Sequence, residues 1–251
     1  MQLFFSIFNR QTVIILLVAL ASSVCSLLLQ FSLYIDFLIL SLIIVFPLTI
    51  TIKEAFNRRE KAIRSYSNLK ASLSTMFYLF ENENIDWDKK NAFKNELIEL
   101  SASLKKYLLG ENEHAATVQK DAESIVRFFI INCDFIKKPV AMKSILFTQR
   151  IQADIEFLLA TKRHHTPTGI RAIILFTIYA FVLFYPASLL HDTGFDVSAW
   201  YVFAMTGFKS LVLISIYNAQ VQLEDPFNAN SPDSIRLDDF QFRGWIESPN
   251  K

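Results

Sequence analysis

The stretch DFLILSLIIVFPLTITIKEAFNRREKAIRSYSNL, residues 36–69, decides the fold of this chain. Its first half is almost entirely apolar and its second half is charged and amphipathic, and Pro47 alone interrupts a continuous helical pattern. An apolar helix of about 20 residues crosses a hydrocarbon core roughly 30 Å thick. Because the charged half cannot stay in lipid, we expect the helix to leave the membrane near Lys53 and to continue into water.

The composition of the whole chain also indicates a membrane protein. Of 251 residues, 52% are hydrophobic, 24 are phenylalanine and 5 are glycine, and the mean hydropathy is +0.31. The apolar residues concentrate toward the two ends of the chain, which is unlike an ordinary soluble domain. The net charge is only +1 at pH 7, so no nucleic-acid partner is expected.

Two membrane spans are predicted before the charged region. Residues 12–52 carry one charge, Asp36, and as a helix they would measure about 60 Å at 1.5 Å per residue, which is enough for two crossings. We expect the first helix to extend from Thr12 to Leu33, the turn to fall at residues 33–36, and Asp36 to cap the second helix. The first run is longer than the apolar core of a signal peptide, so it is interpreted as a retained span.

Two more spans are predicted near the C-terminus, at residues 169–190 and 197–219. The loop between them, HDTGFD, contains neither Lys nor Arg. The flanks on the opposite side are basic and include Arg10, Lys53, Arg58, Arg59, Lys61, Lys162 and Arg163. The positive-inside rule therefore predicts that both termini and the region between spans two and three are cytoplasmic.

The region between the second and third spans is charged and helical. Asp86 and Asp88 are candidate N-caps for a helix that stops at Gly110, and a further helix is expected at about residues 113–135. A last helix follows Pro139, and its expected buried face consists of Val140, Ile145, Ile151, Ile155 and Leu158. The sequence therefore predicts an all-α membrane protein with four transmembrane helices and a cytosolic helical bundle.

This pattern divides the chain into four parts. We expect the first two transmembrane helices in residues 1–53, the cytosolic helical domain in 54–165, the last two transmembrane helices in 166–221, and a tail in 222–251. The tail retains large apolar residues, among them Phe227, Ile235, Leu237, Phe240, Phe242 and Trp245. Such a tail is expected to be ordered by packing on the body or on a neighbouring subunit.

No arrangement of side chains in the sequence indicates catalysis. There is no nucleophile with a neighbouring base, no phosphate-binding loop and no metal-ligand spacing, so we expect no enzyme, cofactor or metal. Cys25 and Cys133 are interpreted as unpaired, buried small residues. Lys209 is a basic residue deep in a span, where an isolated cation is costly. It either contacts ions or an acidic partner at a subunit interface, or it has a packing or snorkelling role.

Three stretches together resemble the bestrophin family of pentameric ion channels. Glu224–Phe240, EDPFNANSPDSIRLDDF, is similar to the family's segment with a DPF or NPF triplet and an acidic, ordered tail. Thr166–Leu190 resembles the third span, and Phe56–Arg58, FNR, resembles the corner at the cytoplasmic end of the second span. The order of the spans and the helical insert also fit, so the resemblance covers nearly the whole chain.

The resemblance implies a homopentamer around a central pore, with particular residues in it. In the family a hydrophobic neck of three residues, four apart, precedes the arginine of the corner, and these positions are here Leu42, Phe46 and Ile50. Residues at this spacing share one helix face, although contact with lipid or another helix would use the same face. Val140 is the candidate for a second constriction, and Asp225, Pro226 and Phe227 are the tail motif.

The implied function is a channel that conducts small monovalent ions, with chloride and other anions as the family default, in a bacterial inner membrane. Its expected partners are inorganic ions, the lipid bilayer and further copies of itself. A cation-selective channel of the same fold and a non-conducting scaffold or sensor with a cytosolic partner are the alternatives. Calcium activation is not expected, because the acidic run after the triplet is replaced by NANSPDS, which holds only Asp233.

Overall fold

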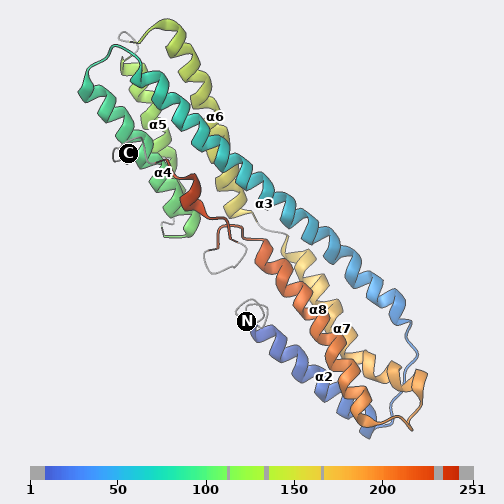
Figure 1. Cartoon of the computed structure of the whole chain (residues 1–251). Coiled ribbons are helices and arrows are strands. Elements are labelled where there is room, and N and C mark those ends of the chain that lie inside the picture. The colour runs from blue at the N-terminus through green and yellow to red at the C-terminus, as the bar shows by residue number, and fades with distance from the viewer. Residues whose placement is uncertain (1–8, 112–113, 133–135, 165–166, 229–233, 243–251) are drawn as a thin grey trace, which may run out of the picture. The chain divides into compact units, whose positions relative to one another are not determined.

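Every regular element in the described part of the chain is a helix (Figure 1). The computed structural model describes residues 9–111, 114–132, 136–164, 167–228 and 234–242. The elements are α2 (Arg10–Leu28), α3 (Phe37–Glu81), α4 (Trp87–Leu109), α5 (Ala115–Asn132), α6 (Lys138–Arg163), α7 (Thr168–Thr193), α8 (Ala199–Leu223) and the short 3-10 helix η2 (Leu237–Phe240). The predicted all-α class is confirmed for these residues.

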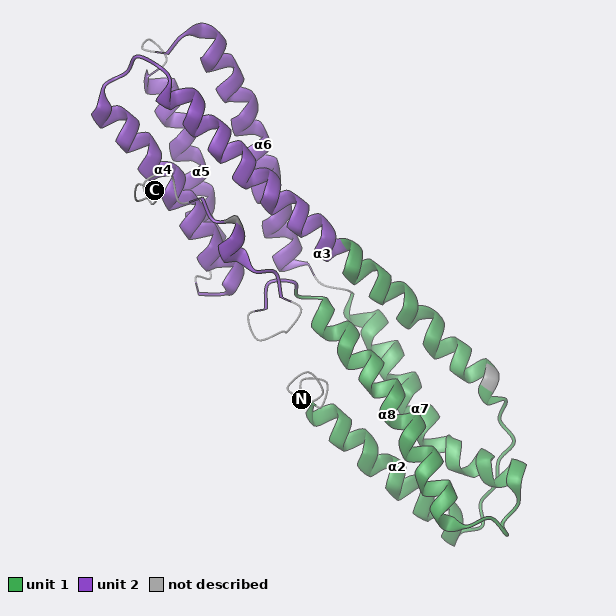
Figure 2. Ribbon diagram, viewed as in Figure 1, with its two compact units in different colours: residues 1–57, 166–225, 231–233 green, residues 58–165, 226–230, 234–251 purple. Residues whose placement is uncertain are grey.

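The chain forms two compact units (Figure 2). Unit 1 contains residues 1–57, 166–225 and 231–233, and unit 2 contains residues 58–165, 226–230 and 234–251. The 45-residue helix α3 contributes its first part to unit 1 and the rest to unit 2. Each unit has a hydrophobic core of its own.

Four helices of the described chain are long and apolar enough to cross a membrane. The stretches that contain them are Arg10–Leu28, Ile39–Glu81, Lys138–Thr193 and Ala199–Leu223, and the mean hydropathy of their most apolar windows lies between 1.5 and 2.2. In the third stretch the apolar residues belong to α7. The expectation of four spans is therefore confirmed by length and composition, and the chain is an integral membrane protein.

Helices α2, α7 and α8 pack side by side in unit 1. Their buried apolar residues include Ile15, Ile178, Val202 and Ile214. At one end of the unit the Asn218 side chain donates to Thr12 Oγ1 at 2.8 Å. Toward the other end the Ser22 hydroxyl donates to the carbonyl of Leu183. These side chains satisfy their polar groups within the protein, as the absence of water from a bilayer core requires.

The first span ends earlier than its apolar sequence predicts. We expected a helix as far as Leu33, but α2 ends at Leu28 and residues 31–36 are not helical. Gln30 has a φ of +48°, which turns the chain, and the N–H of Leu33 donates to the carbonyl of Ala187 at 3.3 Å. The segment after α2 is thus bonded to α7, which hydropathy does not report. Asp36 then caps α3 as expected, since its carboxylate accepts from the N–H of Ile39 at 3.3 Å.

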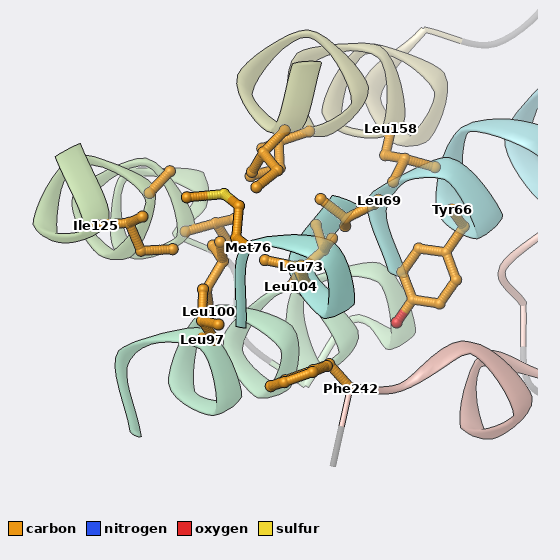
Figure 3. Packing of buried hydrophobic residues seen from close by; sticks show 14 of the residues in the cluster. Tyr66, Leu69, Leu73, Met76, Leu97, Leu100, Leu104, Ile125, Leu158 and Phe242 are labelled. Atoms are coloured by element: carbon orange, nitrogen blue, oxygen red, sulfur yellow. The ribbon is translucent and has the colours of Figure 1, made fainter. Parts of the chain in front are cut away.

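Unit 2 is a helical bundle around a core of leucine and aromatic side chains (Figure 3). Leu69, Leu73 and Met76 of α3 belong to the same core cluster as Leu97, Leu100 and Leu104 of α4, and all six are buried. Helix α4 ends as predicted at Gly110, whose φ of +80° is the left-handed conformation that glycine adopts without strain.

Two expectations about burial are wrong. Ile151, Ile155 and Leu158 form the buried face of α6, but Ile145 of the same series is 55% exposed. At 100° per residue Ile145 lies about 140° around α6 from Val140, which packs against the core, so Ile145 is on a different face of the helix. Cys25 is exposed on α2. A free thiol behaves as a small apolar group, so its contact with lipid costs little. Cys133 lies outside the described residues.

The C-terminal tail packs on the body of unit 2. Phe227, Ile235, Leu237 and Phe242 are buried in the core of the bundle. The N–H of Phe242 donates to the Ser101 hydroxyl at 2.9 Å, and Asp238 pairs with Lys105. The expected packing of the tail on the body of the protein is confirmed for these residues. Trp245 lies outside the described part of the tail.

Candidate pore-lining helix

The membrane part of α3 has two different faces. Ile44, Leu48, Thr51 and Ala55 are buried, and they follow one another at three- or four-residue intervals. This face packs on unit 1, where Ile44 and Leu48 join the core. At its first residue the Phe37 ring packs edge-on against both Phe181 and Tyr185. The other face of α3 is apolar and exposed.

Leu42, Phe46 and Ile50, the three predicted neck residues, lie on that exposed face. Their exposed fractions are 64%, 66% and 47%. At 100° per residue, Phe46 lies about 160° around the helix from Ile44, so it points almost directly away from the core of unit 1. Single-chain exposure of this kind fits a pore, a subunit contact or lipid, and the three residues remain predicted pore residues.

Pro47 lies inside α3 without ending the helix. A proline removes one intrahelical hydrogen bond and leaves the carbonyl four residues earlier, here that of Ile43, without its usual donor. The hydroxyls of Thr49 and Thr51 bond to other carbonyls, since Thr49 donates to the carbonyl of Val45 at 2.8 Å and Thr51 to that of Leu48 at 2.9 Å.

Lys209 is held against an aromatic ring in unit 1. Its Nζ lies 4.3 Å from the centroid of the Tyr185 ring, a geometry that offsets about 0.5–2 kcal/mol of the cost of an ammonium group in an apolar environment. The side chain also lines a cavity of about 480 Å³ together with Phe37, Ser41, Phe181, Phe208, Val212 and Leu213. This contact supports a packing role, and an ion or subunit contact remains the other prediction.

A buried ion pair between α7 and α8 escaped the sequence analysis. Arg171, in the first turns of α7, pairs with Glu224, which follows the last residue of α8, and Gln220 donates to the same carboxylate. The Glu224 side chain is only 2% exposed and that of Arg171 is 29% exposed. The cation of Arg171 lies near the N-terminus of α7 and the anion of Glu224 lies at the C-terminus of α8, so each charge is unfavourable in the dipole of its own helix. Pairing the two charges offsets both of these unfavourable placements. The position of Glu224 directly before the tail motif was the one signal in the sequence that could have pointed to this residue.

The other predicted site residues lie in unit 2 or at its edge. Val140 is half-buried in the first turn of α6 and packs against the core. Arg58, the last residue of the FNR segment, donates from Nη1 to the carbonyl of His164 at 2.9 Å. These contacts give both residues a structural role and leave the predicted second constriction at Val140 as a prediction.

The tail motif Asp225–Pro226–Phe227 begins the segment that folds onto the bundle. Phe227 is 1% exposed, and the carbonyl of Pro226 accepts from the N–H of Ile235 at 2.8 Å. Among the described residues no three His, Cys, Asp or Glu side chains come together as a metal site. Asp233 lies outside the described residues.

Comparison with known proteins finds similarity in structure and none in sequence. No family model and no curated protein matches the chain. Two variants of a bacterial Bestrophin homolog from Klebsiella pneumoniae match with TM-scores of 0.79 and 0.78, each at 14% identity and over 92% of this chain and 95% of that chain. A crystal structure of a membrane protein variant matches over the same shares at 14% identity, with a TM-score of 0.77.

The helices and their packing define an all-α integral membrane protein with four spanning helices and a helical bundle. Within that class the fold is bestrophin-like, as the structural matches along 92% of the chain show. The family predicted from the three sequence stretches is thereby confirmed at the level of fold.

Proposed function

We propose that this protein is a homopentameric channel for small monovalent ions, with anions as the preferred ions and Leu42, Phe46 and Ile50 as its hydrophobic neck. The observation that carries this proposal is the division of α3 into a face buried in unit 1 and an opposite apolar face that is exposed in the single chain. The bestrophin-like fold supports the same conclusion.

Assembly around an axis gives the exposed face of α3 a function. Five copies of this helix would surround a pore with rings of leucine, phenylalanine and isoleucine. Bulky apolar rings in a narrow pore control ion passage through dewetting, because water leaves the constriction when it is too narrow and too apolar. Phe46 is the largest of the three side chains, so we expect it to form the main barrier.

The sign of the conducted ion is assigned through the resemblance, since an apolar neck has no charge with which to select it. A cation-selective channel of the same fold is the alternative. Reversal potentials in asymmetric potassium chloride distinguish the two directly. We further propose a bacterial inner membrane with both termini in the cytoplasm, because the basic residues flank α2, α3 and α7 on one side.

Phe46→Ala is expected to raise ion flux per protein in liposomes. Removing the ring widens the constriction and makes it less prone to dewet, and a barrier lowered by about 1.4 kcal/mol would give about a tenfold increase. The measurement is anion efflux from vesicles containing the purified protein, normalised to reconstituted protein, together with the particle mass in detergent.

Phe176→Ala is the matched control, since Phe176 is 75% exposed on α7 and undergoes the same change in side chain. Its flux should equal that of the unmodified protein. Flux absent from both the unmodified protein and Phe46→Ala, or a monomeric or dimeric particle, would contradict the proposed channel. An equal increase in ion flux in both variants would contradict the assignment of Phe46 to the neck.

A further inference from the structure

A small cavity in unit 2 lies between the end of α3 and the beginning of α4. Its volume is about 150 Å³, and it is lined by Phe77, Phe80, Glu81, Trp87, Lys90, Asn91 and Lys94. This is well below the roughly 300–1,000 Å³ of pockets for drug-sized ligands. A ligand for this cavity is therefore small.

The cavity is built by two helix faces. On α3 the lining residues are three and four positions apart, and on α4 they recur over two turns, so each set lies on one side of its helix. The loop 82–86 between the helices is short. The apolar walls come from Phe77, Phe80 and the ring of Trp87, and the polar groups come mainly from α4.

Lys94 is the unusual member of this lining. The residue is 5% exposed, and no described residue gives its Nζ a hydrogen-bond partner. Lys90, one helical turn earlier, is satisfied differently, because its Nζ donates to the carbonyl of Glu81 at 2.6 Å. A buried ammonium without a partner is costly, so proteins normally place an acceptor or an anion beside it.

The charges of the lining favour an anion. Two lysines face one carboxylate, that of Glu81, which is on an exposed residue at the end of α3. Two ammonium groups one helical turn apart also repel each other, and a bound negative charge would relieve this repulsion. The aromatic side chains provide a flat apolar wall next to the charged groups, which suits an anion that has an apolar body.

We propose that this cavity binds a small organic anion, a monocarboxylate with a flat apolar or aromatic body. Its carboxylate accepts hydrogen bonds from Lys94 Nζ and from the Asn91 amide, and its body lies against Trp87, Phe77 and Phe80. The site belongs to unit 2 alone, and its existence does not depend on ion conduction.

Benzoate is the probe, with benzamide as its uncharged counterpart and inorganic phosphate as an anion without an apolar body. Each is titrated into the detergent-purified full-length protein by calorimetry, and the midpoint of thermal unfolding is measured in parallel. Benzoate should bind and raise the midpoint, and benzamide should do neither. Stabilisation by phosphate and not by benzoate would overturn the organic ligand class, and equal binding of benzamide would overturn the role of charge.

Lys94→Met tests the assigned contact. We expect benzoate to bind at least about tenfold more weakly, since a hydrogen bond to a charged group is lost. The midpoint without benzoate should stay equal or rise, because the buried ammonium is replaced by an apolar group of similar length. A purely structural lysine would instead show a lowered midpoint with unchanged benzoate binding, and that result would overturn the proposal.

Two further variants complete the test. Lys106→Met, an exposed lysine in the last turn of α4, is the control and should bind benzoate as the unmodified protein does. Trp87→Ala is available if Lys94→Met does not fold, because Trp87 is 69% exposed and its loss should leave the fold intact. Weaker benzoate binding in Trp87→Ala supports the proposal, and unchanged binding contradicts it.

Discussion

Arg171→Met is expected to lower the free energy of unfolding of unit 1 by about 3–5 kcal/mol, the usual cost of removing one partner from a buried ion pair. The variant leaves the Glu224 carboxylate, whose side chain is 2% exposed, without its cation. Gln220 is the remaining partner, and a neutral amide cannot balance the charge. The measurement is chemical or thermal unfolding of the protein in detergent, followed by circular dichroism.

The reciprocal change should cost less. In Glu224→Gln the buried carboxylate is replaced by an amide of similar shape, and the remaining Arg171 side chain is 29% exposed and can reach water or lipid headgroups. The double variant Arg171→Met, Glu224→Gln should then be more stable than Arg171→Met alone, with a coupling energy of about 1–3 kcal/mol. Additive effects of the two substitutions would show that the pair contributes nothing as a pair.

Phe227→Ala is expected to destabilise unit 2 by about 3–5 kcal/mol, the range for deleting a fully buried phenylalanine ring. Phe227 is 1% exposed and belongs to the core of the bundle, together with Ile235 and Leu237 of the tail. Loss of its ring leaves a cavity at the point where the tail enters the core. Thermal unfolding and limited proteolysis of the full-length protein measure the effect, and the tail should become the first site of cleavage.

Phe157→Ala is the control for this prediction, because Phe157 lies on α6 of the same unit and is 37% exposed. Its cost should be much smaller than that of Phe227→Ala. If Phe227→Ala instead unfolds like the unmodified protein and changes only the ion flux, the prediction is wrong. The tail motif would then act on conduction, and the packing of Phe227 would not stabilise the bundle.

The spans and the class of fold follow from local properties of the sequence. Hydropathy alone locates four apolar helices, since a helix in lipid must be apolar along most of its length whatever its neighbours are. Helix ends with a clear local signal, such as Asp36 and Gly110, are also predicted correctly. The end of α2 is not, because the apolar sequence continues past Leu28 while the chain turns at Gln30.

The polar groups of the interior were harder to foresee. Arg171 and Glu224 each have an unremarkable place in the sequence, near the end of a predicted span, and nothing local indicates that they meet. Lys94 is one of several lysines in α4, and only the packing of α3 against α4 makes it buried. The wrong expectation for Ile145 has a local origin, since at 100° per residue Ile145 lies about 120° around α6 from Ile151 and is not on the buried face.

Apolar length, helical period and capping residues were therefore enough to predict an all-α membrane protein with four spans and a helical bundle. These features depend on interactions between neighbours in the chain, or between a segment and its solvent. The ion pair of Arg171 with Glu224, the cavity at Lys94 and the contact of Lys209 with Tyr185 join residues far apart in the chain or on separate helices. Such pairings arise when helices pack, because packing decides which charges lose water and which partners then face them.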